Sequence, residues 1–314
     1  MKILIFGAGV IGITYGWQLA KAGNHITLFV RPGRAETLRR NGIQIDCLDM
    51  RGMAARSIRE PFRPDIVESL NPTDDYDLII VSVNSNQITG VLPYLKEHAG
   101  NIDIMFFSNN WNGVKEIEQT LDRGRFFFGY PFKAGGGRDD AGIQTVIFGT
   151  PFTDTVLGEL DGTRSNRLLK IRQELKKAGM NPTISPNIRG YLMSHFIWAA
   201  ANVAAYMKAG SYEYFSTNSK MIAQMYLAMR EGFEVCRALG VDPARLSPTC
   251  YYYLPLWLLV PFTRWLYGQA ALRRMFEGHV LHSPDEMNDM IRVVLQSARD
   301  LNVPTPILSS MAVK

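Results

Sequence analysis

The chain has 314 residues, of which 46% are hydrophobic and 20% charged, and its formal net charge is +5. This length is comfortable for two domains, and the composition is typical of a globular protein. The small positive charge is scattered along the chain, which suits an anionic ligand and argues against nucleic acid as a partner. Three cysteines, Cys47, Cys236 and Cys250, lie far apart without metal-ligand spacing. Because their number is odd, we expect a reducing, cytoplasmic location and no disulfide framework. Because of their spacing, we expect no bound metal.

The N-terminal half alternates strand patterns with helical patterns. The first apolar run, 3–6, lies almost at the N-terminus, so we expect no signal peptide before it. The run at 77–83 is continuously apolar, as expected of a strand that is buried on both faces. Such alternation predicts an α/β fold with a doubly wound parallel sheet of the Rossmann type. The expected strands are 3–6, 25–30, 77–83, 102–107 and 126–130.

The pattern changes after Gly149. Apolar residues then recur at helical spacing from Leu168 to Ala178, and Gly179 marks the end of that helix. Residues 181–185 are a candidate for a last strand, and from about residue 188 the chain is helical in pattern almost throughout. We therefore place a Rossmann-type domain at 1–186. An all-helical domain for substrate binding and dimerisation follows at 187–314.

One segment, 251–268, has the strongly apolar and aromatic sequence YYYLPLWLLVPFTRWLYG. Pro255, Pro261 and Arg264 interrupt it, so it is short and broken for a bilayer span, which needs about 20 mostly apolar residues. We expect no stable membrane insertion. The expected structure is a buried helical hairpin or a subunit contact, which allows a homodimer. A lid over an apolar ligand and a membrane-surface patch are the alternatives.

A G-x-G-x-x-G motif occupies residues 7–12, directly after the first expected strand and before a helical pattern. In a dinucleotide-binding unit the first glycine allows the tight turn, the second lets the pyrophosphate approach, and the third brings the helix close to the strand. The pyrophosphate then rests on the helix N-terminus, where free N–H groups favour an anion. The predicted cofactor contacts are Gly7, Gly9, Val10, Ile11 and Gly12.

The residues after the second expected strand predict which dinucleotide binds. An acidic residue there would hydrogen-bond the ribose 2′-hydroxyl of NAD. The sequence has Arg31 and Arg34 instead and no Asp or Glu at that point. Guanidinium groups pair with a 2′-phosphate by charge-assisted hydrogen bonds, so NADP(H) is the expected cofactor. The alternative is a pair of solvated loop arginines.

Together the N-terminal glycine motif, the arginine after the second strand and the helical second half resemble the ketopantoate reductase family. The resemblance spans the whole chain and is strongest over 1–115 and 283–306. It implies reduction of 2-dehydropantoate to pantoate with NADPH. It also implies a cofactor contact at Gln87. Asn84 stands at the position where the family has a lysine. Asn110 falls on the asparagine beside the nicotinamide ribose and substrate, and Trp111 replaces a glycine in that turn.

In the second half the resemblance implies a catalytic lysine, and this sequence has Ser194 or His195 there instead. As an imidazolium with an ordinary pKa of about 6.5, His195 could donate a proton, although a core histidine is an equal alternative. Asn202 matches one of two helix asparagines and is a predicted substrate contact. Glu286 matches an acidic residue that binds a substrate hydroxyl. Its competing role is a capping box with Ser283.

These residues predict an NADPH-dependent reductase of a 2-oxo acid, with ketopantoate as the default substrate by resemblance. The catalytic candidates are His195, Glu286 and Asn110. Two alternatives stay open because the expected lysines are absent: a non-catalytic NADP-binding protein, and a reductase of a bulkier, apolar carbonyl compound.

Overall fold

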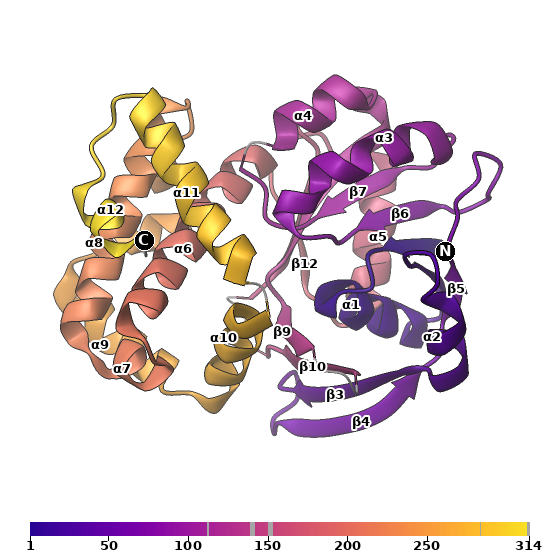
Figure 1. Cartoon of the computed structure of the whole chain (residues 1–314), viewed down its shortest axis with the longest axis horizontal. Helices are drawn as coiled ribbons and strands as arrows, with labels where there is room; N and C mark the ends of the chain where they lie inside the picture. Colours follow the sequence, from indigo (N-terminus) through magenta and orange to yellow (C-terminus); the bar gives the residue numbers. More distant parts are fainter. Residues whose placement is uncertain (112, 139–141, 150–152, 283, 313–314) are drawn as a thin grey trace. The chain divides into compact units, whose positions relative to one another are not determined.

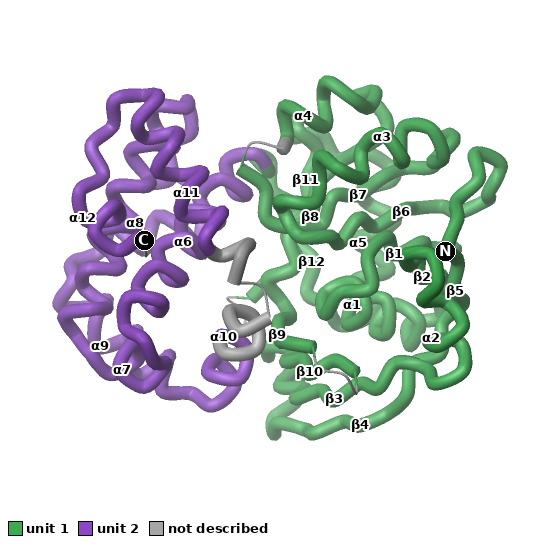
Figure 2. Tube along the Cα trace, in the orientation of Figure 1, with its two compact units in different colours: residues 1–188 green, residues 189–314 purple. Residues whose placement is uncertain are grey.

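The computed structural model describes the chain except residues 112, 139–141, 150–152, 283 and 313–314, and except the side chains at 113, 277–282 and 284–287. The described chain divides into two compact units, Met1–Ile188 and Arg189–Lys314 (Figure 2). The boundary expected from the sequence lies between residues 186 and 187.

Unit 1 is built on a sheet of eight described strands in the order β12-β11-β8-β7-β6-β1-β2-β5 (Figure 1). Its neighbours are parallel except for β8 and β11, which are antiparallel. The strands are β1 (Lys2–Phe6), β2 (His25–Phe29), β5 (Asp65–Val67), β6 (Leu78–Val81), β7 (Ile104–Phe107), β8 (Phe126–Pro131), β11 (Thr155–Gly158) and β12 (Pro182–Ile184).

The central strands are continuously apolar because both faces of the sheet are covered. Ile5 of β1 lies beside Leu28 of β2 and Ile80 of β6, and all three side chains are buried. This burial pattern is that of a doubly wound sheet, and the predicted α/β fold is confirmed. The helices of unit 1 are α1 (Val10–Lys21), α2 (Ala35–Asn41), α3 (Ile88–His98), α4 (Gly113–Thr120) and α5 (Asn166–Lys177).

A second sheet of unit 1, in the order β4-β3-β10-β9, was not expected from the sequence. It packs against α1 (Figure 1). The hydroxyl of Thr14 in that helix donates to the hydroxyl of Thr145 in β10 over 3.0 Å. Thr145 in turn donates to the carbonyl of Gly135 in β9 over 3.1 Å. The strands are β3 (Ile43–Asp49), β4 (Arg56–Phe62), β9 (Ala134–Arg138) and β10 (Gly142–Ile147).

The regular elements of unit 2 are all helices among its described residues, as predicted. The side chain of Asn218 caps α8 by accepting from Met221 N over 2.9 Å, and Gly240, with φ +82°, follows the end of that helix. Short 3-10 helices at Pro243–Arg245 and Thr249–Tyr253 link α8 to α9. The helices are α6 (Ile188–Ala209), α7 (Tyr212–Thr217), α8 (Ser219–Ala238), α9 (Leu256–Tyr267), α10 (Ala270–His282), α11 (Pro284–Asp300) and α12 (Pro306–Met311).

The expectation of a buried helical hairpin at 251–268 is wrong. A single α-helix, α9, forms there, and only one face of it is buried. The buried residues are Leu259, Thr263 and Tyr267, which recur at helical spacing. The rest of the segment carries large exposed apolar side chains, among the described residues Tyr251, Leu254, Trp257, Leu258, Phe262 and Trp265. No helix in the described chain is long and apolar enough to cross a bilayer.

Candidate functional site

The glycine loop between β1 and α1 has the geometry that the motif requires. Gly7 has φ +114°, a conformation that a side chain would strain. A Cβ on Gly12 would lie 2.3 Å from the carbonyl oxygen of Gly7 and 2.3 Å from the Ser82 hydroxyl, so only glycine lets α1 sit this close. A Cβ on Gly9 would meet nothing nearer than the Ser82 carbonyl oxygen at 3.9 Å. The surface above Gly9 is therefore open for a ligand to approach the backbone.

The N-terminus of α1 is suited to an anion. The first helical hydrogen bond runs from Ile13 N to Gly9 O over 2.9 Å, so the N–H groups of Val10 and Ile11 precede it. No described side chain caps this end, and its first turn carries no acidic residue. Free N–H groups and the positive end of the helix dipole together favour a phosphate here.

Ser82, directly after β6, fixes the glycine loop, a role that the sequence did not reveal. Its hydroxyl donates to Gly7 O over 3.0 Å, and its backbone N–H donates to Phe6 O over 2.9 Å. Phe6 lies beside Val81, and Val81 lies beside Phe106 of β7. The carboxyl ends of β1, β6 and β7 therefore meet at one edge of the sheet. Ligands of doubly wound sheets bind at this edge, where the strand order reverses.

Three consecutive polar residues at the end of β7 bring unsatisfied atoms to that edge. Ser108 Oγ, Asn109 Oδ1 and Asn110 Nδ2 are buried and have no hydrogen-bond partner among the described residues. Asn110 is held in place because its Oδ1 accepts from Val114 N over 3.1 Å. Buried polar groups are almost always paired, so three orphaned atoms in a row indicate a ligand with complementary groups. The resemblance singled out Asn110, but Ser108 and Asn109 had no signal beyond their position after a strand.

Arg31 and Arg34 lie in the exposed loop after β2, as predicted. The turn closes with a hydrogen bond from Arg34 N to Arg31 O over 3.2 Å, and Gly33 has φ +82°. Neither arginine forms an ion pair with another described residue. One carboxylate does lie beside this loop. Glu68 accepts from Ala35 N over 2.8 Å, so it is engaged at the first turn of α2.

Gln87 and Asn84 follow β6 at the start of α3. Gln87 is exposed, ends the short 3-10 helix Ser85–Gln87, and donates its backbone N–H to Asn84 O over 2.9 Å. Asn84 precedes that helix, and its side chain makes no capping hydrogen bond. Both residues therefore lie on the short segment that leads from β6 into α3.

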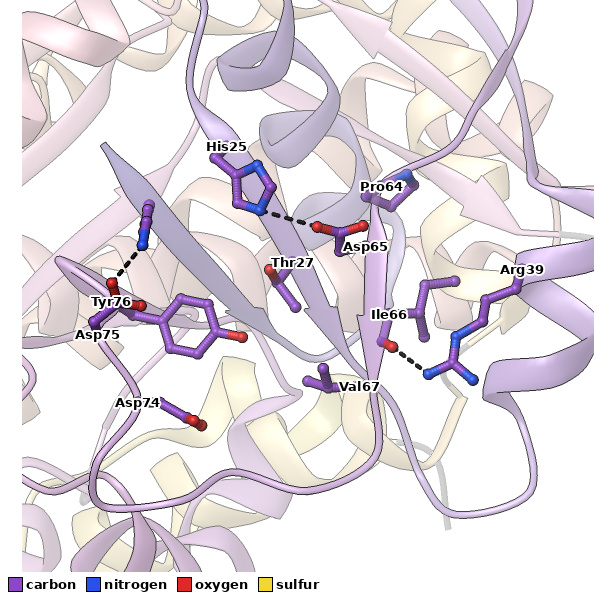
Figure 3. A pocket seen from close by; sticks show the side chains of 11 residues that line it. His25, Thr27, Arg39, Pro64, Asp65, Ile66, Val67, Asp74, Asp75 and Tyr76 are labelled. Carbon is purple, nitrogen blue, oxygen red and sulfur yellow. Dashed lines mark hydrogen bonds and ion pairs between the residues drawn. The ribbon is translucent and has the colours of Figure 1, made fainter.

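A hollow of about 430 Å³ lies at the opposite, amino end of the sheet (Figure 3). Several of its charged groups already have partners: His25 contacts Asp65 at 2.9 Å, and Arg39 donates to the backbone carbonyl of Ile66 over 2.5 Å. Lys2 likewise pairs with Asp75. Because parallel sheets bind ligands at their carboxyl ends, this hollow does not compete with the glycine loop.

His195 lies on α6 in unit 2. Its ring is stacked on Tyr191, with 6.0 Å between ring centroids, and tilted against Trp198, with 5.0 Å between centroids. It is buried, and burial lowers the pKa of His195 to about 3. The imidazole is therefore neutral near pH 7, which differs from the imidazolium considered from the sequence. Its neighbour Ser194 is also buried, and Ser194 Oγ has no hydrogen-bond partner in the described chain.

The amide of Asn202, seven residues further along α6, is engaged at both ends. Its Nδ2 donates to Trp198 O over 2.7 Å, and its Oδ1 accepts from the buried hydroxyl of Tyr267 in α9. A substrate contact by Asn202 stays a prediction, since it would have to replace the bond to Tyr267. The side chain of Glu286 and the whole of Ser283 lie outside the described residues.

Comparison with known proteins gives the family of the chain. The family model "Ketopantoate reductase PanE/ApbA" matches residues 3–162. The uncharacterized oxidoreductase YkpB of Bacillus subtilis is 24% identical over 203 residues, which span 64% of this chain and 63% of YkpB. The alignment thus covers less than two thirds of that relative.

Two solved structures are similar over nearly the whole chain. The 2-dehydropantoate 2-reductase of Geobacter metallireducens has a TM-score of 0.76 at 14% identity, covering 99% of this chain and 98% of its own. D-mandelate dehydrogenase has a TM-score of 0.72 at 16% identity, covering 99% and 96%. At such identities these structures show the fold. Because the family model spans just over half of the residues, the protein belongs to the ketopantoate reductase PanE/ApbA family of oxidoreductases.

Proposed function

We propose that the protein reduces a 2-oxo acid to the 2-hydroxy acid with NADPH, and that ketopantoate is the substrate to test first. The observation that carries this proposal is the glycine loop of unit 1, open above Gly9 and followed by Arg31 and Arg34. Membership of the family supports the reaction class. When bound, NADPH supplies the hydride that the carbonyl carbon receives.

The residues of unit 1 would hold the cofactor. In this proposal the N–H groups of Val10 and Ile11 bind the pyrophosphate, which lies over Gly9. The orphaned atoms of Asn109 and Asn110 bind the nicotinamide ribose and carboxamide. Gln87 adds a contact from the start of α3. Each of these residues positions the dinucleotide, and none of them is required to change its protonation state.

The proton for the developing alkoxide is assigned to His195 in this proposal. A neutral imidazole still carries one N–H, so it can donate a hydrogen bond and a proton without holding a permanent charge. Ser194, with its unpartnered hydroxyl, is the alternative donor. By resemblance to the family, Glu286 is proposed to bind a hydroxyl of the substrate.

An aromatic 2-oxo acid is a second candidate substrate. D-mandelate dehydrogenase, whose fold this chain shares, has been solved with NADH and anilino(oxo)acetate. His195 of the present chain lies between two aromatic rings, which favours an apolar substituent on the substrate. Oxidation of NADPH should be measured by absorbance with ketopantoate and with benzoylformate. If NADPH binds tightly and no 2-oxo acid stimulates its oxidation, the non-catalytic alternative replaces this proposal.

Arg31→Ala should raise the KM for NADPH by roughly 10- to 100-fold and leave the KM for NADH within about a factor of three, because a charge-assisted bond to the 2′-phosphate is lost. Steady-state kinetics with both cofactors measure this. Arg56→Ala, an exposed arginine at the start of β4, is the control and should change neither constant. Equal effects on the KM for NADPH and the KM for NADH would contradict a contact between Arg31 and the 2′-phosphate.

His195→Ala should lower kcat by about 100-fold, the usual contribution of a general acid, while leaving the KM for NADPH unchanged. With the pKa of His195 lowered to about 3, the wild-type imidazole stays neutral above that pH, so kcat should not fall as pH rises between about 5.5 and 8. A fall of kcat through about pH 6.5 would instead indicate an imidazolium donor. His25→Ala, at the amino end of β2, is the control, and an unchanged kcat in His195→Ala would leave this residue as part of the core.

A further inference from the structure

Arg138 is the last residue of β9, in the second sheet of unit 1, and it reaches the glycine loop of the first. Its Nη1 donates to the carbonyl oxygen of Ala8 over 2.9 Å, although the two residues are 130 positions apart in the sequence. The neighbouring residues of β9 make this approach possible. Gly135, Gly136 and Gly137 carry no side chains, and a Cβ on Gly136 would lie 2.0 Å from Gln144 O.

The surroundings of Arg138 are positively charged. Its guanidinium is half-buried, and burial together with the nearby charge of Arg34 lowers the pKa of Arg138. Ala8 O is its one hydrogen-bond partner among the described residues, and neither Arg138, Arg34 nor Arg31 pairs with a described carboxylate. Like charges in a partly desolvated place repel each other, so this arrangement is stabilised when an anion lies among the guanidinium groups. Most N–H donors of Arg138 are left to bind that anion.

We propose that Arg138 determines cofactor specificity by binding the 2′-phosphate of the adenosine ribose together with Arg34 and Arg31. This inference rests on the proposed use of NADPH, and it adds a residue from a separate sheet to the site. The loop after β2 is where the ribose 2′ position lies in doubly wound folds, and Arg34 belongs to that loop. The bond to Ala8 O fixes Arg138 beside the glycine loop. A guanidinium on each side of the phosphate provides the planar, bidentate donors that such a group favours.

Calorimetric titration of Arg138→Gln with NADPH and NADH tests the proposal without any turnover. The two cofactors differ only in the 2′-phosphate. The Kd for NADPH should rise about 10- to 100-fold, and the Kd for NADH should change by less than about threefold. As a second pair of ligands, 2′,5′-ADP should lose affinity and 5′-AMP should not. Arg59→Gln, an exposed arginine of β4 in the same sheet, is the matched control and should bind all four ligands normally.

Equal losses for NADPH and NADH would place Arg138 on the pyrophosphate or on the loop structure, and unchanged binding of both would remove it from the site. Either result overturns the proposal. If Arg138→Gln does not fold, Arg138→Lys is the second variant, because a lysine keeps the positive charge but lacks the planar, bidentate donors of the guanidinium. That variant should bind 2′,5′-ADP with reduced affinity, and a wild-type Kd would contradict the proposal. A wild-type protein that fails to reduce any 2-oxo acid leaves these titrations unaffected. A wild-type protein without preference for NADPH over NADH refutes the proposed cofactor itself.

Discussion

Gly12→Ala should destabilise unit 1 and abolish nucleotide binding at the same time. The added Cβ would lie 2.3 Å from Gly7 O, 2.3 Å from Ser82 Oγ and 2.9 Å from a methyl group of Ile5. Gly7 O is backbone and accepts from Ser82, so α1 has to move away from β1 to relieve the contact. Overpacking of this kind costs roughly 3 kcal/mol of unfolding free energy when backbone must shift. The Kd for NADPH should rise by at least about 100-fold, because the N–H groups of α1 leave their positions.

Gly9→Ala is the matched control for this prediction. Its Cβ would have 3.9 Å to the nearest atom, so the free enzyme should unfold in urea at nearly the wild-type concentration. The same methyl group projects into the space through which a pyrophosphate approaches the backbone, so NADPH binding should still be lost. The two variants thus separate packing from ligand access. Tight NADPH binding by either variant would refute the assignment of this loop.

Arg167→Met should lower the free energy of unfolding by about 3–5 kcal/mol, because it leaves a buried carboxylate without its charged partner and with only the Ser165 hydroxyl as a donor among the described residues. Arg167 donates to both oxygens of Glu159, at 2.8 Å from Nε and 2.7 Å from Nη2, and the Glu159 side chain is only 8% exposed. It also donates to Asp103 over 3.0 Å and to the carbonyl oxygen of Phe126 over 2.8 Å. The guanidinium therefore joins α5 to β8 and to the start of β7.

Urea denaturation with an unchanged slope would measure this loss. Arg237→Met is the comparison, since its pairs with Glu234 and Asp242 lie at the surface of unit 2, where such pairs contribute about 0–1 kcal/mol. Arg167→Lys should lose part of the stability, because a lysine keeps the charge and cannot donate to both oxygens of Glu159 at once. A loss below about 1 kcal/mol in Arg167→Met would show that the carboxylate of Glu159 is relieved by water.

Local patterns predicted the parallel strands at the centre of unit 1 and the helices of unit 2. Ile3 to Phe6 and Leu78 to Val81 are apolar at every position, which is the signal of a strand buried on both faces. The second sheet escaped prediction because its strands lack that signal. β4 is mostly exposed and charged, and β9 is rich in glycine, which disfavours strands in general. β9 forms because it pairs with the neighbouring strand β10 and packs against α1, and the contact with α1 is distant in sequence.

The glycine loop could be predicted from the six consecutive residues 7–12 because backbone conformation is a local property. Arg31 and Arg34 could also be predicted from a local pattern, because they follow a strand whose end is visible in the sequence. The roles of Ser82, Asn109 and Arg138 depend on which strand ends and hairpins lie beside that loop. The protonation state of His195 was also beyond the sequence, since burial in the helical unit lowers its pKa to about 3.

The sequence was therefore sufficient for the fold class, the dinucleotide motif and the family, because these depend on short patterns of apolar residues and glycines. Long-range packing was required for the rest of the site. It brings a hydroxyl from β6, three orphaned polar atoms from the end of β7 and a guanidinium from a separate sheet toward one edge of the sheet. It also exposes the aromatic face of α9, for which the sequence had left a buried hairpin and a subunit contact both open. The burial of a side chain and the charges around it depend on residues that are distant in the sequence, so no short stretch of residues predicts them.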